Sequence, residues 1–304
     1  MTKQVDLSKL PAPKVIEEID FETLLTARKQ NFLARFADSA ERAHWQSRLT
    51  LESDPVTKLL EENAYLETLL RARINAAAKS VMLAYATDSD LDHLGALLGV
   101  ERLIEVAANP TANPPIEAEY ETDDRFRTRI QLSLESKTTA GSRNSYYWHT
   151  LTASTDVKDA EITSPQPGTV DVTVLSKKTQ GQADSALINI VKTALNAEDV
   201  RPLTDTVNVK SATIISYNIN AELTLYPSTA EAVILEKVQS AVRQFVENKH
   251  KLGFDITLSA IYASLHQEGV QNVQLKAPTA DLVIQPTQVG YCTAININVG
   301  GRNE

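Results

Sequence analysis

The first hundred residues carry apolar side chains at helical spacing. Asp20 precedes a run in which apolar residues recur every three or four positions, and Asp is a favoured residue at a helix N-cap. A second helix start lies in "SDPVTKLL", where Asp54 can cap the helix and Pro55 suits its first turn. Because no further Gly or Pro comes before Gly95, the pattern predicts one helix over 55–86, about 48 Å long at a rise of about 1.5 Å per residue.

This long helix carries one apolar stripe, in which steps of three and four residues alternate almost as in a heptad, so it should pack lengthwise on other helices. Two interpretations are open. The helix is either the core of its own domain, with Asn63 and Arg73 at the margin of the stripe, or part of an intermolecular bundle in which a buried Asn63 fixes the register. The second is favoured because the region has few other long apolar helices to cover the first. The candidate bundle-interface residues are Val56, Leu59, Leu60, Asn63, Leu66, Leu70, Arg73, Ile74, Ala77 and Val81.

Acidic residues in this region are interpreted as structural. Glu67 is placed on the face opposite the stripe, where a change to Lys is expected to be tolerated. The triplet Asp88, Asp90 and Asp92 lies in a predicted short helix, "DSDLDHLGALLGV". A calcium loop of the EF-hand type needs Gly at its sixth position and Glu at its twelfth, and the chain has His93 and Gly99 there. Helix capping and compensation of the helix dipole explain the triplet better.

A Pro-rich segment, 107–120, separates this helical region from the rest of the chain. Its text "AANPTANPPIEAE" contains three prolines, which disfavour helix and favour extended chain. We therefore predict a helical bundle-forming region over 1–106 and a linker over 107–120.

The remainder of the chain alternates helical and strand patterns. Two stretches, "VKDAEITSP" at 157–165 and "VQNVQLKAP" at 270–278, match in character at every apolar position. Each is preceded by a predicted helix and followed by a further strand, and "ADLVI" and "GYCTAININV" are predicted to complete the second sheet. The repeat predicts two related α/β units with short mixed sheets, 121–211 and 212–304. The fold class predicted for the whole chain is α+β, with a helical N-terminal region that contains one long bundle helix.

Composition and charge exclude several classes of partner. The 304-residue chain has a net charge of -9, whereas nucleic-acid binding and polybasic membrane contact both need a basic surface. No apolar run approaches the roughly 20 residues of a membrane-spanning helix, and the start of the sequence has no apolar core of a secretory signal. Cys292 is the single cysteine, which excludes an intrachain disulfide and fits assembly in a reducing cytoplasm.

The residue types of catalytic and metal sites do not occur at useful spacing. None of the five histidines lies three or four residues from another histidine or from Cys292. The sequence contains no nucleophile elbow, no P-loop and no dinucleotide-binding glycine motif. We therefore predict no catalytic residue, no metal ligand and no cofactor. An acidic chain with large apolar faces and no such site is expected to act through protein contacts.

Several segments together resemble the baseplate protein J family of contractile phage tails and tailocins. The N-terminal match is "DLSKLPAPKVIEEIDFETLLTARK" followed by "LESDPVTKLLEENAYLETLLRARINAAAKSVMLAYA". The central match is "TDDRFRTRIQ", "ITSPQPGTVDVTVLS" and "LNAEDVRPLTDTVNV", and the C-terminal match is "HKLGFDITLSAIYASLHQEGVQNVQLKAP". The order and spacing of these segments cover nearly the whole chain and carry the resemblance.

The resemblance implies a structural protein without catalysis. Two copies and one baseplate protein I would form a wedge, and six wedges would close into a ring around the central hub and spike. The N-terminal helices would form a bundle with those of protein I, beside baseplate protein W, and the C-terminal α/β units would pair with a second copy. Neighbouring wedges and the sheath are further implied contacts. Assembly in the host bacterial cytoplasm and a final place in a phage tail or tailocin baseplate follow from the same resemblance.

Two other function classes remain possible from the residues alone. A hydrolase with a degenerate site would also be an acidic α/β protein, although the missing His and Ser pairs count against it. A general cytosolic scaffold of helical and α/β modules is the other alternative. Genes for a tail spike, protein W and protein I beside the gene for this chain would favour the baseplate assignment over both.

Overall fold

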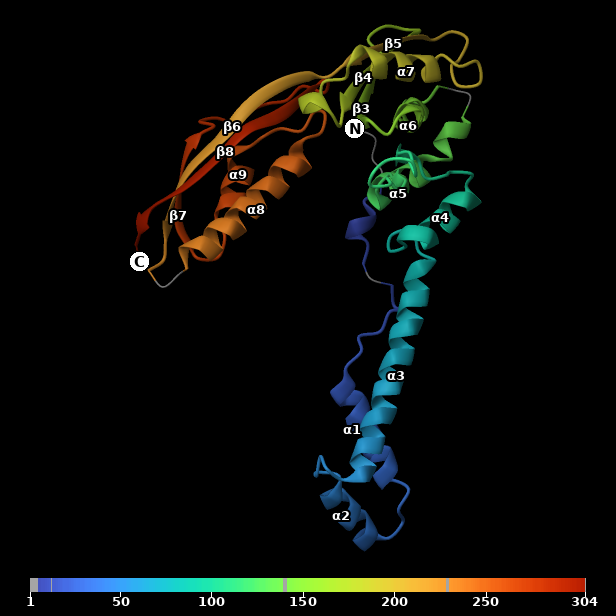
Figure 1. Ribbon diagram of the computed structural model, residues 1–304, viewed down its shortest axis with the longest axis vertical. Helices are drawn as coiled ribbons and strands as arrows, with labels where there is room; N and C mark the ends of the chain where they lie inside the picture. The colour runs from blue at the N-terminus through green and yellow to red at the C-terminus, as the bar shows by residue number, and fades with distance from the viewer. Residues whose placement is uncertain (1–4, 12, 139–140, 228–229, 304) are drawn as a thin grey trace. The chain divides into compact units, whose positions relative to one another are not determined.

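The computed structural model describes residues 5–11, 13–138, 141–227 and 230–303, and these divide into two compact units, one up to Glu101 and one from Arg102 onward. The first unit is helical, and the second combines helices with three small sheets (Figure 1). The fold class is α+β, as the sequence predicts.

The helical unit contains two helices whose starts the sequence predicts correctly. Asp20 caps α1, with its carboxylate accepting a hydrogen bond from the Thr23 backbone N–H at 3.0 Å. Asp54 caps α3 and accepts from the Val56 N–H at 2.8 Å. The elements of the unit are a 3-10 turn at Leu7–Lys9, α1 at Phe21–Leu33, α2 at Ser39–Arg48, α3 at Pro55–Ser80 and α4 at Asp88–Leu97.

Helix α3 is shorter than predicted. It ends at Ser80 and not at residue 86, so Val81 is the C-cap residue and lies outside the helix. The Ser80 hydroxyl donates to the Ala77 carbonyl, and Ser in this position offers the backbone an alternative partner to the helical ladder. The chain then turns, with the Tyr85 and Ala86 N–H groups both donating to the Met82 carbonyl. The segment 81–86 is therefore not helical, although it contains no Gly or Pro.

Helix α2 has no counterpart in the sequence-based prediction. Its text, "SAERAHWQSR", is almost wholly polar and has no buried residue, so hydrophobic periodicity does not reveal it. An aromatic contact fixes it instead: the Trp45 ring lies 5.5 Å from Phe32 and 6.0 Å from Phe36, between ring centroids. Arg48 adds an ion pair to the buried Asp54 that caps α3.

The second unit begins at Arg102, before the segment predicted as a linker. Strands β1 at Ile104–Val106 and β2 at Glu119–Tyr120 pair antiparallel, and an isolated bridge joins Asn109 to Ile116. The Pro-rich segment is thus the connection of a short β-ladder. The boundaries predicted at 121 and 212 for independent α/β units stay predictions.

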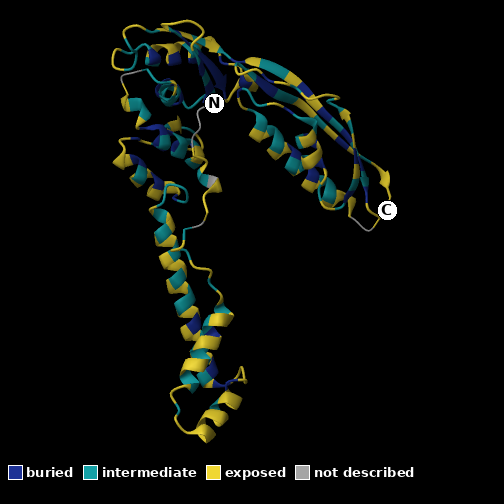
Figure 2. Cartoon of the chain, turned by 180° about the vertical axis from the view of Figure 1, so that it is seen from behind, coloured by how far each residue is buried: buried dark blue, intermediate teal, exposed yellow. Residues whose placement is uncertain are grey.

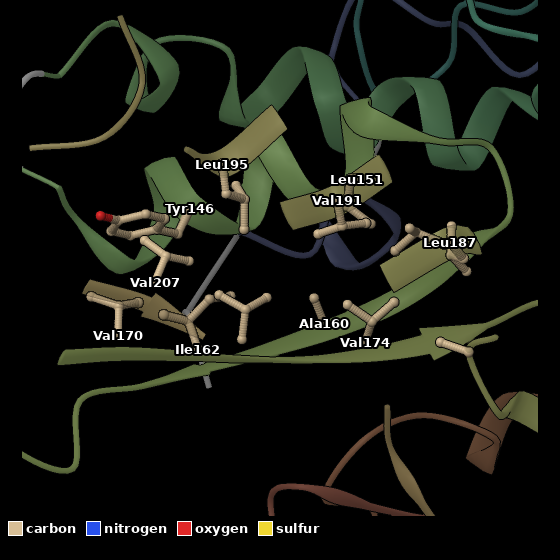
Figure 3. Close-up of a cluster of buried hydrophobic side chains, with 13 residues drawn as sticks. Tyr146, Leu151, Ala160, Ile162, Val170, Val174, Leu187, Val191, Leu195 and Val207 are labelled. Carbon is tan, nitrogen blue, oxygen red and sulfur yellow. The ribbon is translucent and has the colours of Figure 1, made fainter. Parts of the chain in front are cut away.

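The first α/β sheet has the order β3-β4-β5, with β3 antiparallel and β5 parallel to the central β4. Apolar side chains on the helix-facing side of the sheet form a core with Leu151 of α6 and Leu187, Val191 and Leu195 of α7 (Figure 3). The elements are α5 at Asp123–Leu132, α6 at Arg143–Ala153, β3 at Val157–Thr163, β4 at Thr169–Ser176, α7 at Ser185–Leu195 and β5 at Thr206–Ser211, with 3-10 turns at Glu135–Lys137 and Thr179–Gly181.

The second sheet has the order β7-β6-β8, again with one antiparallel and one parallel pairing to the centre. Helices α8 and α9 cover one face and place Val238, Val242, Ile261 and Leu265 in its core (Figure 1). The predicted strand "ADLVI" is wrong: only Leu282 forms a bridge there, to Ile256. The elements are β6 at Thr213–Leu225, α8 at Glu231–Lys249, α9 at Leu258–Leu265, β7 at Val270–Ala277 and β8 at Gln288–Arg302.

The repeated nine-residue motif has the same structure in both sheets. Each copy forms the antiparallel edge strand, β3 or β7, and each skips its second residue in the ladder, Lys158 in β3 and Gln271 in β7, while β7 skips Lys276 as well. The residue after each bulge bonds its own neighbour: Asp159 Oδ1 accepts from the Ala160 N–H at 2.8 Å, and Asn272 Oδ1 accepts from Val273 at 2.9 Å. The connectivity differs, however, because β3 leads directly into its central strand whereas β6 precedes β7.

Candidate protein-binding interface

Helix α3 uses one of its faces to pack within the helical unit. Thr57 and Ala64 are buried on this face, and the face lies against α1. Small residues there allow the two helices to approach closely. This accounts for the part of α3 that the chain covers itself.

Charged residues continue this contact along α3, and Glu67 lies at its centre. Its carboxylate accepts hydrogen bonds from Arg28 of α1 at 2.5 Å and from the Arg71 Nε at 3.0 Å. These bonds lower the pKa of Glu67, and the bond from Arg28 has the larger effect on it. Arg71 also pairs with Glu17 at 2.6 Å, and Asn75 exchanges two hydrogen bonds with the Glu17 backbone. Glu67 therefore takes part in the contact with α1, and on these contacts a change to Lys is no longer expected to be tolerated.

Much of the surface of α3 is exposed (Figure 2). The candidate interface residues lie along this helix, except Val81, which follows it as the C-cap residue. Leu59, Leu66, Leu70 and Ile74 are 58%, 55%, 61% and 53% exposed, values that large apolar side chains rarely show together on one helix. Val56 and Leu60, in the first turns, are half-buried, while Ala77 is exposed and Val81, at the C-cap, is 69% exposed. We call this set the α3 stripe.

The two polar members of the α3 stripe are also exposed within the chain. The Asn63 side-chain amide donates to the Leu59 carbonyl of its own helix at 2.8 Å, so its partner here is local. Arg73 is exposed one turn before Ala77. Whether Asn63 is buried and sets a register in an assembly stays a prediction. Contiguous exposed apolar surface of this kind is typical of a protein–protein interface.

A buried ion-pair cluster in the second unit was missed by the sequence analysis. Glu121 is 1% exposed and pairs with Arg125 at 3.1 Å and with Arg129, whose side chain is also buried. Burial lowers the pKa of both arginines, and the pairing with Glu121 opposes this effect. Arg125 further donates to the Leu151, Ser154 and Val157 carbonyls, and Leu103 N–H donates to Glu121. The cluster therefore joins the β-ladder segment to α5, α6 and β3.

A second polar cluster lies where the two α/β sheets meet. Lys158 of β3 pairs with Glu247 of α8 at 2.6 Å and lies 2.9 Å from His250 Nδ1. Burial and, next, the charge of Lys158 lower the pKa of His250. These groups line an open cavity of about 480 Å³ together with Lys177, Gln180, Gly181, Val246, Tyr291 and Cys292. Its two lysines are both in ion pairs, so the cluster is best explained as a structural junction.

Neither unit supplies a metal site or a membrane span in its described residues. Over the described ranges, no group of three or more His, Cys, Asp or Glu side chains is placed to hold a metal ion. Of the helices that the structure describes, none combines the length and apolar character required to cross a membrane.

The family models and a sequence relative identify the same family. Family models match three consecutive parts of the chain: the Baseplate J-like N-terminal domain over 52–109, the central domain over 138–211 and the C-terminal domain over 217–298. The chain is 44% identical over 300 residues to baseplate protein J of Escherichia phage P2, covering 99% of each chain. Among solved structures, it resembles a chain of the anti-feeding prophage baseplate with a TM-score of 0.41 and 12% identity, over 60% of this chain and 43% of that one.

The two units and their exposed helix thus belong to a structural protein of a viral tail baseplate. Within that class, the chain is a member of the baseplate J family.

Proposed function

We propose that this chain is a wedge component of a contractile-tail baseplate and that the α3 stripe is its seam with partner helices. The partner helices are those of baseplate protein I, with protein W beside the bundle, and the C-terminal α/β units pair with a second copy of the chain. Six such wedges close into a ring around the hub and spike, in contact with neighbouring wedges and the sheath. Assembly takes place in the cytoplasm of the bacterial host, and the chain carries out no catalysis.

The observation that carries this proposal is the division of α3 into a packed face and an exposed apolar one. Glu67, Arg71 and Asn75 bind the packed side to α1 and the N-terminal segment, so the unit is complete without covering the α3 stripe. Leu59, Leu66 and Leu70 are then left in water. At about 25 cal/mol per Å² of apolar area removed from water, covering such side chains strongly favours association.

The experiment is co-expression of the full chain with baseplate protein I, comparing wild type with Leu70→Asp. An aspartate in an apolar seam is a buried unpaired charge, which costs on the order of 3–5 kcal/mol. Leu70→Asp should therefore abolish the complex in size-exclusion chromatography. Because Leu70 is 61% exposed in the chain itself, the thermal unfolding of the isolated variant should stay within a degree or two of wild type.

The matched control is Ala72→Asp, which adds the same charge. Ala72 is exposed, and two residues at about 100° each place it on the side of α3 away from Leu70. This variant should assemble normally. A complex that forms equally well with Leu70→Asp contradicts the seam, and a Leu70→Asp chain that unfolds shows that the helix serves an internal core.

A further inference from the structure

Strand β8 is the longest strand of its sheet and has only one strand neighbour. Its 15 residues pair with β6 over their whole length, and the sheet order β7-β6-β8 leaves its other side at the edge. At the start of the strand the Gly253 N–H donates to the Gln288 carbonyl. Further along, no strand of the described chain pairs with the outer side. Backbone N–H and C=O groups that point outward from an edge strand are available to a further strand.

The sequence of β8 lacks the usual protection of an exposed edge. No charged residue occurs between Gln288 and Gly301, a run of 14 residues. The opposite edge strand, β7, carries Lys276 and is followed directly by Pro278, and charged side chains and prolines commonly block edge-to-edge pairing. The contrast between two edges of one sheet indicates that the β8 edge is built to be paired.

A regular window lies at the centre of this edge. The ladder with β6 skips Thr293 and Gly300, so residues 294–299 form an uninterrupted stretch between two bulges. Within it Ile295, Ile297 and Val299 turn toward the core that α8 and α9 cover, and Ile295 and Val299 remain half-buried. Ala294, Asn296 and Asn298 are exposed on the other face.

We propose that the β8 edge pairs antiparallel with the β8 edge of a second copy, forming one continuous six-stranded sheet across a two-fold axis near Ile297. This rests on the proposed function, in which a second copy is a partner, and assigns that contact to a strand. The occupant is a second copy because the window is self-complementary in this register. Ile295 meets the partner's Val299 over the core face, and Asn296 meets the partner's Asn298 on the open face.

This pairing makes favourable side-chain contacts on both faces of the joined sheet. Opposite residues in an antiparallel pair share a face, so apolar side chains extend the core and leave water. An asparagine amide both donates and accepts, so two of them pair without charge. A two-fold axis of this kind brings the same surface of both copies together, which gives a closed dimer and not an open filament.

The test uses full chains that all carry Leu70→Asp, so that association through α3 does not contribute. Their self-association is measured by sedimentation equilibrium. The chain with an intact edge should form a dimer. Asn296→Lys with Asn298→Lys opposes like charges across the axis and should weaken the dimer at least tenfold, and so should the corresponding double change to Glu. A 1:1 mixture of the Lys and Glu chains should restore dimers, because each Lys then faces a Glu.

The control places the same charge on the same exposed face but one strand inward, as Asn218→Lys with Asn220→Lys in β6. It should leave the dimer unchanged. A chain with an intact edge that is monomeric at its highest soluble concentration overturns the inference, as does a Lys variant that still dimerises or a mixture that fails to restore dimers. Co-assembly with protein I is measured in a separate experiment, with chains that keep Leu70. The α3 seam and the β8 contact can therefore be disproved independently.

Discussion

Asp159 of β3 accepts a hydrogen bond from the backbone N–H of Leu252, which follows α8, at 3.1 Å. Its other oxygen accepts from the Tyr147 hydroxyl at 3.1 Å and from the Ala160 N–H. The carboxyl is almost wholly buried, and this burial raises its pKa although all three hydrogen bonds lower it. One side chain thus links the two α/β sheets across more than ninety residues of sequence.

Replacement of Asp159 by Ala should loosen this link. It leaves the Leu252 N–H and the Tyr147 hydroxyl without their acceptor, at a cost of about 1–3 kcal/mol for each buried group. Hydrogen exchange measured residue by residue should show faster exchange at Leu252 and in the last turn of α8. The matched control is Asn272→Ala, at the corresponding position of the repeated motif in β7. Because the Asn272 side chain accepts from the N–H of its neighbour Val273, its effect should stay local. Equal protection at Leu252 in both variants would exclude a linking role.

Glu67→Lys should detach α1 from α3. The new ammonium faces Arg28 and Arg71, so two attractive contacts become repulsive within one cluster. The expected result is a lower Tm of the helical unit and rapid amide exchange in α1, with the second unit unaffected. Glu62→Lys is the control on the same helix, since that side chain is exposed. Unchanged exchange in α1 of the Glu67 variant would mean that apolar contacts alone hold the two helices together.

Acidification should destabilise the helical unit, because it protonates carboxylates that form hydrogen bonds in the folded state. Hydrogen bonds lower the pKa values of Glu67, Asp54 and Asp20 below 4.5, 3.8 and 3.8, their ordinary values. A group with a depressed folded-state pKa contributes stability that is present above the unfolded pKa and is lost as the pH falls through the folded one. Stability should therefore be constant above about pH 5 and decrease below it. Fluorescence of Trp45 in a Trp148→Phe chain reports this, and a signal independent of pH down to 3 would contradict it.

Removal of the buried carboxylate in Glu121→Ala should destabilise the second unit strongly. Arg125 and Arg129 would remain buried without their anion, and breaking a buried ion pair from one side costs about 3–5 kcal/mol. Thermal unfolding should show a large decrease in Tm. Asp124→Ala removes a carboxylate that is 97% exposed and should shift the Tm little. Similar shifts in the two variants would show that the cluster adds no stability.

Local signals account for what the sequence predicted well. Asp20 and Asp54 cap helices as expected, because capping depends only on residues within one turn. The alternation in the repeated motif correctly gave β3 and β7. Helix α2 was missed because an aromatic contact, and not an apolar stripe, holds it in place. The end of α3 at Ser80 was missed because no Gly or Pro marks it. In the Glu121 cluster Arg125 lies only four residues from Glu121, but the carbonyl partners that hold Arg125 lie far along the chain. The Asp159 link is also long-range, and no periodicity marks such partners.

The shortness of the connection between the two sheets has a mechanical consequence. Strand β5 ends at Ser211 and β6 begins at Thr213, so Ala212 alone connects them. Ala212 is 5% exposed, donates to the Val174 carbonyl at 2.9 Å and packs with Leu175, Leu252 and Val289. No flexible linker at this point can absorb a rotation of one sheet relative to the other. Torque applied to the C-terminal sheet by a neighbour would therefore pass through the backbone into β4 and β5, and the second unit would transmit load as a lever.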